Sequence, residues 1–161
     1  MGAGDISREV LSDRRATPGL IQIRDATADD AAALARLCGQ LGHPAKTEEM
    51  PARLARLATD PNIRVLVADS HEGVVGLATV HVRHMINHEA PLAQLTTLVV
   101  DEQFRGQGVG RALVATAERL AHERACKRLI VTTALRRTDA HAFYERLGFT
   151  HTGRRYGKDF L

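Results

Sequence analysis

Apolar residues recur along the chain at two kinds of spacing, and these spacings predict its helices and strands. Spacings of three and four residues predict helices at 27–42, 47–58, 108–123 and 138–147. Short apolar runs predict strands at 20–23, 63–68, 74–82, 95–100 and 129–133, and residues 149–160 are expected to form a final strand or hairpin. The order is βααβββαβαβ, and the hairpin from 63 to 82 must be antiparallel. We therefore expect an α/β fold in which about four helices flank a mixed sheet.

Turn and capping residues mark several of the predicted boundaries. Thr27 and Asp30 resemble a capping box before the first helix, and Gly42 and Gly148 stand where glycine commonly ends a helix. Pro18-Gly19 precedes the first strand, so residues 1–18 are expected to form a flexible N-terminal tail. The rest of the 161-residue chain, 19–161, has the length of a single domain.

Composition narrows the class of protein. Hydrophobic residues make up 44% of the chain and charged residues 25%, as in an ordinary soluble globular protein. The first twenty residues carry several charges, and no apolar run approaches the roughly 20 residues that span a membrane. Cys38 and Cys126 are too far apart to suggest a metal pair or a disulfide framework. We therefore expect a cytoplasmic protein with no membrane segment and no metal.

The charge of the chain suits an anionic ligand. Its formal net charge is +3 and its pI is about 9.2, and phosphates are the obvious candidates. Nucleic acid is the competing partner. The chain has no Trp and only 4% aromatic residues, so a platform for stacking bases is not expected.

The most informative stretch is a turn with three glycines between the strand at 95–100 and the helix at 108–123. Glycines let a backbone approach a ligand closely, and the first turn of a helix offers free N–H groups and partial positive charge to an anion. Arg105 and Arg111 flank this turn. It lacks the Lys of a Walker loop and the spacing of a dinucleotide fingerprint, but it satisfies Arg/Gln-x-x-Gly-x-Gly/Ala through Arg105, Gly108 and Gly110. Taken alone, it could equally be a tight connection without a ligand.

A second motif lies one helix and one strand further along. The segment Ala140-His141-Ala142-Phe143-Tyr144-Glu145-Arg146-Leu147-Gly148-Phe149 resembles the A-x-x-F-Y-x-x-x-G-F motif of the GNAT superfamily of N-acetyltransferases, and the glycine turn resembles that family's pyrophosphate-binding turn. The resemblance is good from about 63 to 160 and plausible from 20. It implies a sheet splayed between the strands at about 95–100 and 129–133, acetyl-CoA as the cofactor, an amine as the acceptor, and a homodimer, because small relatives often dimerise.

The resemblance also implies roles for particular residues. Tyr144 would act as general acid toward the departing thiolate, and the backbone N–H of Leu98 would stabilise the thioester oxyanion. The cofactor would bind to the strand at Leu98, Val99 and Val100 and to the turn at Arg105, Gly106, Gln107, Gly108, Val109, Gly110 and Arg111. Further cofactor contacts are expected from Thr133, Arg137, Phe143 and Tyr144, although Arg137 stands where relatives often have Asn.

The residue that deprotonates the amine does not follow from the motifs. Many relatives place a Glu four residues before the oxyanion position, where this chain has Gln94, which cannot act as a base. Imidazole suits the task, and His81, His84, His88 and Glu89 lie before the cofactor strand. A water relay held by Gln94 and a threonine, Thr96 or Thr97, is an equal alternative. Because the three histidines span a strand end and a loop, a zinc site is not expected.

The function indicated by these features is transfer of the acetyl group of acetyl-CoA to a primary amine of a small molecule, or of a peptide or protein, by direct attack in a ternary complex. The alternative is a non-catalytic module of the same fold that senses acyl-CoA, which Gln94 would favour. The sequence leaves the acceptor open among small amines, antibiotics, polyamines and protein N-termini.

Overall fold

The computed structural model describes residues 20–161. The expected tail at 1–18 and Gly19 lie outside the described residues. Short 3-10 turns at Ala28–Asp30, Thr47–Glu49 and Glu102–Phe104 precede helices. The strands are β1 Gln22–Asp25, β2 Ile63–Ser70, β3 Gly73–Arg83, β4 Leu92–Val100 and β5 Arg128–Val131, and the helices are α1 Ala31–Gln40, α2 Met50–Ala58, α3 Val109–Glu123 and α4 Thr138–Arg146.

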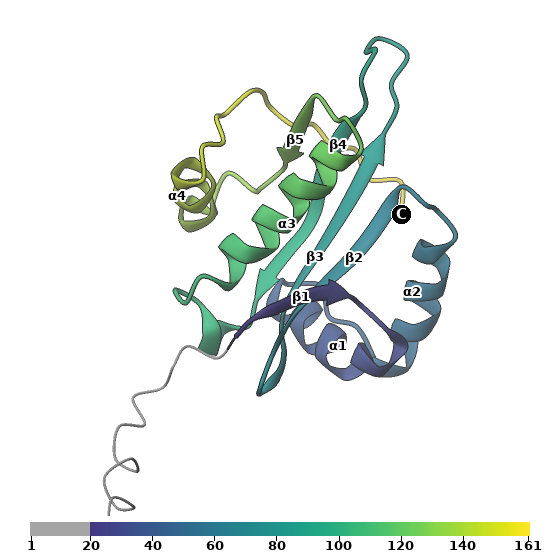
Figure 1. Ribbon diagram of the computed structural model, residues 1–161, viewed down its shortest axis with the longest axis vertical. Coiled ribbons are helices and arrows are strands. Elements are labelled where there is room, and N and C mark those ends of the chain that lie inside the picture. Colours follow the sequence, from purple (N-terminus) through teal and green to yellow (C-terminus); the bar gives the residue numbers. More distant parts are fainter. Residues whose placement is uncertain (1–19) are drawn as a thin grey trace, which may run out of the picture.

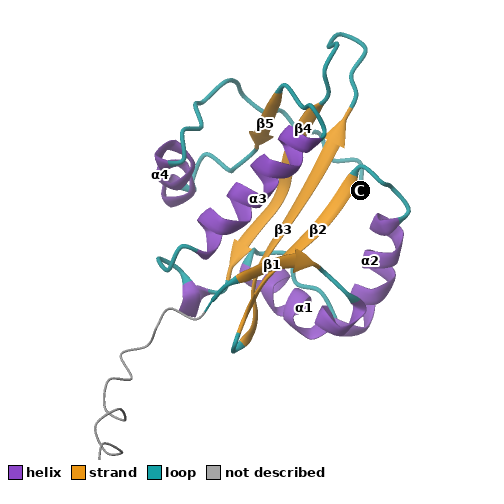
Figure 2. Cartoon of the chain, in the orientation of Figure 1, coloured by secondary structure: helices purple, strands orange, loops and turns teal. Residues whose placement is uncertain are grey.

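The five strands form one mixed sheet in the order β1-β2-β3-β4-β5, which confirms the expected α/β architecture. The first four strands pair antiparallel, and β4 pairs parallel with β5. Helix α3 lies across one face of the sheet, and α1 and α2 cover the other (Figure 1; Figure 2). Within the part of the chain that is described, no helix is long and apolar enough to cross a membrane.

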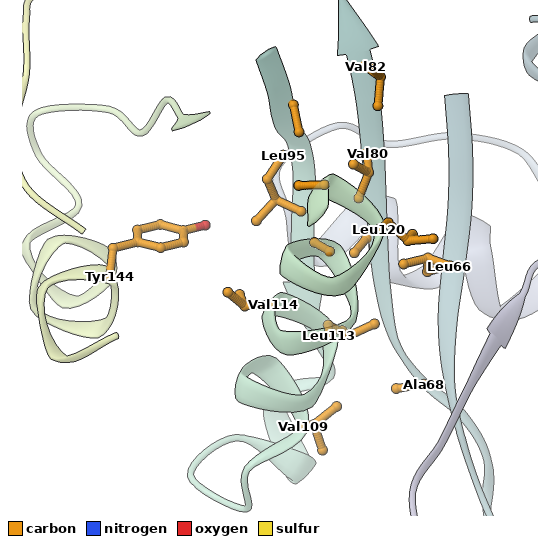
Figure 3. Packing of buried hydrophobic residues seen from close by; sticks show 14 of the residues in the cluster. Leu66, Ala68, Val80, Val82, Leu95, Val109, Leu113, Val114, Leu120 and Tyr144 are labelled. Carbon is orange, nitrogen blue, oxygen red and sulfur yellow. The ribbon is translucent and has the colours of Figure 1, made fainter. Parts of the chain in front are cut away.

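Strand periodicity divides the core between the two faces. In β2, Leu66 and Ala68 are buried in the cluster beneath α3, and Val67 between them is buried in the cluster beneath α1 and α2. Successive side chains of a strand point to opposite faces, so a sheet covered on both sides buries both sets. Figure 3 shows the α3 side of this core, to which Leu66, Val80 and Leu113 belong.

A β-bulge interrupts β4 at Thr96. On β3, Thr79 pairs with Thr97 and the next residue, Val80, pairs with Leu95, so Thr96 is the extra residue. The bulge changes the parity of the strand. It keeps the apolar side chains on both sides of the bulge packed with the α3 cluster: Ala93, Leu95, Leu98 and Val100.

The sheet opens directly after the bulge. Strand β5 pairs with β4 only from Leu92 to Leu95, opposite Arg128 to Val131. Residues 97–100 therefore pair with β3 on one side and with no strand of residues 20–161 on the other. Beyond Val131 the chain turns away toward α4 (Figure 2). This is the splay that the sequence predicts between these two strands.

The prediction of a final strand or hairpin at 149–160 is wrong. Residues 149–161 contain no helix or strand, and every side chain from 150 onward is exposed. The segment is rich in charge, and Gly153 and Gly157 interrupt it, so it offers no alternating apolar face to bury. A hydrogen bond from Arg155 Nη1 to Thr132 Oγ1, at 3.4 Å, ties it to the end of β5.

All five strands differ from their predicted bounds by one to three residues at one end or both, and β1 and β4 show the reason. Strand β1 covers 22–25 rather than 20–23, because its partners are Leu66 to Asp69 of β2. Strand β4 begins at Leu92 rather than at residue 95, because its first residues pair with β3 on one side and β5 on the other. Both shifts follow from pairing partners that local sequence does not reveal.

Candidate active site

The turn between β4 and α3 adopts a conformation that requires glycine. Gly106 and Gly108 have φ angles of +74° and +84°, in the left-handed region where residues with a Cβ are strained. Gly108 is the N-cap of α3, and its carbonyl accepts the first helical hydrogen bond, from Ala112 N at 3.0 Å. The N–H groups of Val109, Gly110 and Arg111 have no partner within residues 20–161. Free N–H groups and the helix dipole together make this turn a site for an anion.

Side chains around the turn add positive charge. Arg105 lies over the turn and donates from Nε to the carbonyl oxygen of Val100 at 3.2 Å. Arg111 is exposed on the first turn of α3. Arg111 and Arg146 both line a shallow depression between α3 and α4. Sequence analysis did not identify Arg146, because it occupies a variable position of the second motif and has the character of an ordinary polar helix residue.

Gly110 has a structural explanation of its own. It is buried, and a Cβ placed on it would lie 3.2 Å from Cζ of Phe143. A methyl group would therefore press against the Phe143 ring, and the glycine allows α3 and α4 to approach. Phe143, expected to contact a cofactor, is half-buried in this helix contact.

Tyr144 projects from α4 toward the sheet. Figure 3 shows its ring extending from α4 with the hydroxyl oxygen leading, toward the side of the sheet on which Leu95 lies. The residue is only 9% exposed, and its ring makes edge contacts with Phe143 and Phe149, at centroid distances of 5.2 and 5.5 Å. Its hydroxyl has no hydrogen-bond partner among the described residues. Burial raises the pKa of Tyr144 to about 12, although Arg137 opposes the rise, so the phenol keeps its proton at neutral pH.

The open edge of β4 carries the residues expected to bind the cofactor arm. Leu98, Val99 and Val100 pair with β3 but not with β5, so backbone groups on their other side have no strand partner among residues 20–161. Thr133, just past the end of β5, has a buried hydroxyl with no hydrogen-bond partner among residues 20–161. A buried orphan hydroxyl calls for a partner that the protein itself does not supply.

A patch of polar side chains lies on the opposite face of the sheet, next to the opening. We call it the polar patch: Thr79, His81, Gln94 and Thr97, all half-buried. His84 is not part of it, because it is exposed in the segment that follows β3, as is Glu89. Residues 20–161 hold no group of three or more His, Cys, Asp or Glu side chains that could bind a metal ion.

Helix α1 fastens the glycine turn to the sheet. Arg36 forms an ion pair with Asp101, which is 6% exposed, and donates to the Val74 carbonyl oxygen at 2.9 Å. Asp101 also accepts a hydrogen bond from Gln103 N at 3.0 Å, and Gln40 accepts one from Glu102 N at 3.0 Å. Sequence reasoning missed this arrangement, because Arg36 and Gln40 lie more than sixty residues before Asp101 and Glu102 and belong to no motif.

The geometry therefore combines four features at one opening of the sheet. These are an anion site at the α3 N-terminus, an unpaired strand edge, a protonated phenol that points toward the sheet, and a polar patch on the far face. Such an arrangement fits a ligand with phosphates at one end and an extended, amide-bearing arm that pairs with a strand edge.

Comparison with known proteins identifies a family whose members bind such a ligand. The model of the acetyltransferase (GNAT) family matches residues 28–149. The chain is 33% identical over 136 residues to an aminoglycoside N(6')-acetyltransferase type 1 from Stenotrophomonas maltophilia, covering 82% of this chain and 88% of that one. It is 29% identical over 138 residues to an aminoalkylphosphonate N-acetyltransferase from Salmonella typhimurium, covering 85% and 90%. Its fold matches an aminoglycoside N-acetyltransferase in complex with CoA, with a TM-score of 0.77 at 21% identity, covering 88% of this chain and 95% of that one.

The family match spans most of the chain and includes both motifs. The two relatives align over nearly their whole lengths. The chain belongs to the GNAT acetyltransferase family and is an acetyl-CoA-dependent N-acetyltransferase.

Proposed function

We propose that the protein acetylates a primary amine of a small molecule, and that the amine attacks acetyl-CoA directly in a ternary complex. The observation that carries this proposal is the opening between β4 and β5, with the α3 N-terminus on one side and the polar patch on the other. The names of the two curated relatives support the acceptor class, because aminoalkylphosphonates and aminoglycosides are both small molecules that bear amines.

Acetyl-CoA supplies an acetyl group activated as a thioester. Its pyrophosphate would be held by the N–H groups of Val109, Gly110 and Arg111 and by the guanidinium groups of Arg105 and Arg111. The remaining backbone of the turn belongs to Gly106, Gln107 and Gly108. The unpaired edge at Leu98–Val100 would hold the pantetheine amides as an added strand would, and Thr133 Oγ1 would find its missing partner there.

Tyr144 is proposed as the group that assists the departing sulfur. With its pKa raised to about 12, the phenol is protonated throughout the physiological range and offers a hydrogen bond. A free thiol titrates near 8.5, so the buried phenol is the weaker acid and acts first by hydrogen-bonding the thiolate. The N–H of Leu98 is proposed as the donor to the carbonyl oxygen, where negative charge develops during the attack.

A panel of amines tests the function. Purified protein is incubated with acetyl-CoA and, separately, an aminoalkylphosphonate, an aminoglycoside, a polyamine and a peptide with a free N-terminus. CoA release gives the rate, and mass spectrometry identifies the product. We expect steady-state turnover with one or more of the small molecules. Binding of acetyl-CoA without turnover on any amine would instead favour the non-catalytic module.

We also propose that the protein is a cytoplasmic homodimer. Strand β5 stands at the edge of the sheet, and Leu135, which follows it, is an exposed large apolar residue, as are Tyr156 and Phe160 in the C-terminal segment. An uncovered strand edge with exposed apolar side chains favours association. Sedimentation equilibrium measures the mass directly, and a monomer at every accessible concentration would contradict the dimer.

A further inference from the structure

An amine acceptor needs a group that takes its proton. An alkylamine with a pKa of about 10.4 is neutral in fewer than about one molecule per thousand at neutral pH, and only the neutral form can attack. The position at which many relatives carry a carboxylate holds Gln94, which cannot accept a proton. The protein must therefore supply the proton acceptor from another position or leave the step to solvent.

The polar patch is built by the pairing of β3 with β4. His81 lies opposite Gln94, and Thr79 lies opposite Thr97. The neighbours of these residues along each strand, including Val80 and Leu95, are buried in the α3 cluster, so the patch faces the other way. On that face Leu77 and Val99 still belong to the apolar cluster under α1 and α2. The polar patch begins where this apolar cover ends.

The patch borders the opening of the sheet. Gln94 and Leu95 are the last β4 residues that pair with β5, and the bulged residue Thr96 follows. Gln94 and Thr97 thus flank the bulge on the face opposite α3. The four polar side chains therefore lie beside the opening on the face from which an acceptor could approach it.

His81 is the one member of the patch that can take up a proton, and a carboxylate stands beside it. Its Nε2 lies 3.7 Å from Oδ2 of Asp60, in the turn before β2. The other Asp60 oxygen, Oδ1, accepts a hydrogen bond from Asn62 N at 2.9 Å, which fixes the carboxylate. The register partners of His81, Ile63 and Gln94, are uncharged, and Arg83 follows on the same face two residues along β3.

We infer that His81 is the catalytic base that deprotonates the acceptor, and that Asp60 is the positioning residue that orients the imidazole. This inference rests on the proposed acetyltransferase function of the same site. With Nε2 toward Asp60, Nδ1 is the nitrogen free to face the acceptor, directly or through a water held by Gln94.

The proposed step balances as follows. The ammonium gives one proton to His81, and the nitrogen lone pair forms the new N–C bond as the C–S bond breaks. The sulfur leaves with the bonding electron pair and takes a proton donated by Tyr144. The nitrogen loses its second proton, which restores the Tyr144 phenol through solvent, and His81 releases its own proton to solvent. The net products are the amide, CoA as a free thiol and one proton.

Two acceptors of different basicity distinguish a catalytic base from a residue that only supports the structure. One is the alkylamine that wild-type protein acetylates fastest in the panel, which is a cation at neutral pH. The other is hydroxylamine, which is already neutral there. We expect His81→Asn to lower kcat/KM for the alkylamine about 10²–10⁴-fold, the usual contribution of a general base, and to affect hydroxylamine far less. Asp60→Asn should show the same preference with a smaller loss.

Matched controls separate the possible failures. His71→Asn changes an exposed histidine in the turn between β2 and β3 and should leave both rates unchanged. If His81→Asn does not fold, His81→Gln provides a second variant, and melting temperature with and without acetyl-CoA reports the folded, ligand-competent state of each. Wild-type rates in His81→Asn, or an equal loss with both acceptors, would overturn the role of His81 and leave the acetyltransferase function intact. A wild-type protein that binds acetyl-CoA but acetylates no amine would overturn the proposed function and, with it, this inference.

Discussion

Tyr144 joins a buried ring to a hydroxyl that finds no partner among the described residues. The hydroxyl is not among the buried polar atoms that lack a partner, and it makes no hydrogen bond to residues 20–161, so it adds no hydrogen bond to the stability of the fold. Stability alone therefore does not explain the tyrosine, and the edge contacts with Phe143 and Phe149 would be made equally well by Phe. The hydroxyl is best explained by a ligand that it contacts.

The first prediction follows from this argument. Tyr144→Phe should lower kcat about 10²–10⁴-fold and leave acetyl-CoA affinity nearly unchanged, because only the transition state loses an interaction. The melting temperature should fall little or rise. If Tyr144 only packs, kcat would stay at the wild-type value. A pre-steady-state measurement of the chemical step covers the case in which product release limits turnover.

The raised pKa of Tyr144 also predicts how stability depends on pH. The folded protein holds the phenol proton up to about pH 12, whereas an unfolded chain releases it near 10. Between these values the folded state binds more protons than the unfolded state. The phenol's contribution to the free energy of unfolding is therefore fully present below about pH 10 and is lost as the pH rises toward 12. Urea denaturation across this range should show a steeper loss for wild type than for Tyr144→Phe. Equal slopes would mean that the phenol is not buried in solution.

At the scale of elements, α1 and the glycine turn are coupled through Arg36 and Asp101. Asp101 is 6% exposed and directly follows β4, and Arg36 reaches it from α1, which lies on the other face of the sheet from α3. Removing one member of such a pair leaves a buried carboxylate without its counter-ion. Because Asp101 also accepts the Gln103 N–H, its displacement would loosen the turn that carries the free N–H groups.

Arg36→Met should therefore lower the free energy of unfolding by about 1–3 kcal/mol and weaken acetyl-CoA binding, since it leaves a buried acceptor short of a partner. Arg53→Met is the matched control. Both arginine side chains are 45% exposed, but Arg53 pairs with Glu49, which is itself exposed. The control should change stability by no more than about 0.5 kcal/mol, as expected for a surface helix pair. Equal effects of the two substitutions would show that the burial of Asp101 does not determine how much its ion pair contributes to stability. Urea denaturation and titration calorimetry give the two quantities.

The elements that sequence predicts well are those with a strong local signal. The helices of 31–40 and 109–123, the β2–β3 hairpin and the glycine turn all depend on spacing, caps or turn residues within one segment. The bulge at Thr96 depends instead on the register between two strands, and the pair of Arg36 with Asp101 on tertiary packing. His81 illustrates the difference. The sequence offers it as one histidine among several, and only the pairing with Gln94 and the nearness of Asp60 set it apart.

Residues 149–160 show that a local pattern can also predict an element that does not form. The pattern of 149–160 suggests a strand, but a strand needs a partner edge and an apolar face. In the structure these residues leave β5 without a further neighbour, and Tyr156 and Phe160 remain exposed. A local preference was therefore not sufficient to form an element.

For the whole molecule, one opening in the sheet joins two binding regions. The α3 N-terminus and the free β4 edge lie toward one face, and the polar patch lies on the other, so two ligands can meet at the bulge without sharing a pocket. This arrangement suits direct transfer between two bound molecules. It also means that a ligand on the α3 side would bridge α3, α4 and β4, of which α4 otherwise joins the core through Phe143, Tyr144 and their neighbours.

Acetyl-CoA should accordingly stabilise the whole fold. A ligand that binds only the folded state raises the free energy of unfolding by about 2.7 kcal/mol at a hundredfold excess over its dissociation constant. For a chain of this size, each kcal/mol raises the melting temperature by about 2–4 °C, so the expected rise is roughly 5–11 °C. Gly108→Glu is the matched negative control, because no atom crowds a side chain there, yet the position needs φ near +84° and a carboxylate would repel the phosphates. This variant should fold with a lower melting temperature that acetyl-CoA does not raise. A wild-type melting temperature unmoved by millimolar acetyl-CoA, or an equal rise in Gly108→Glu, would show that the glycine turn does not hold the cofactor.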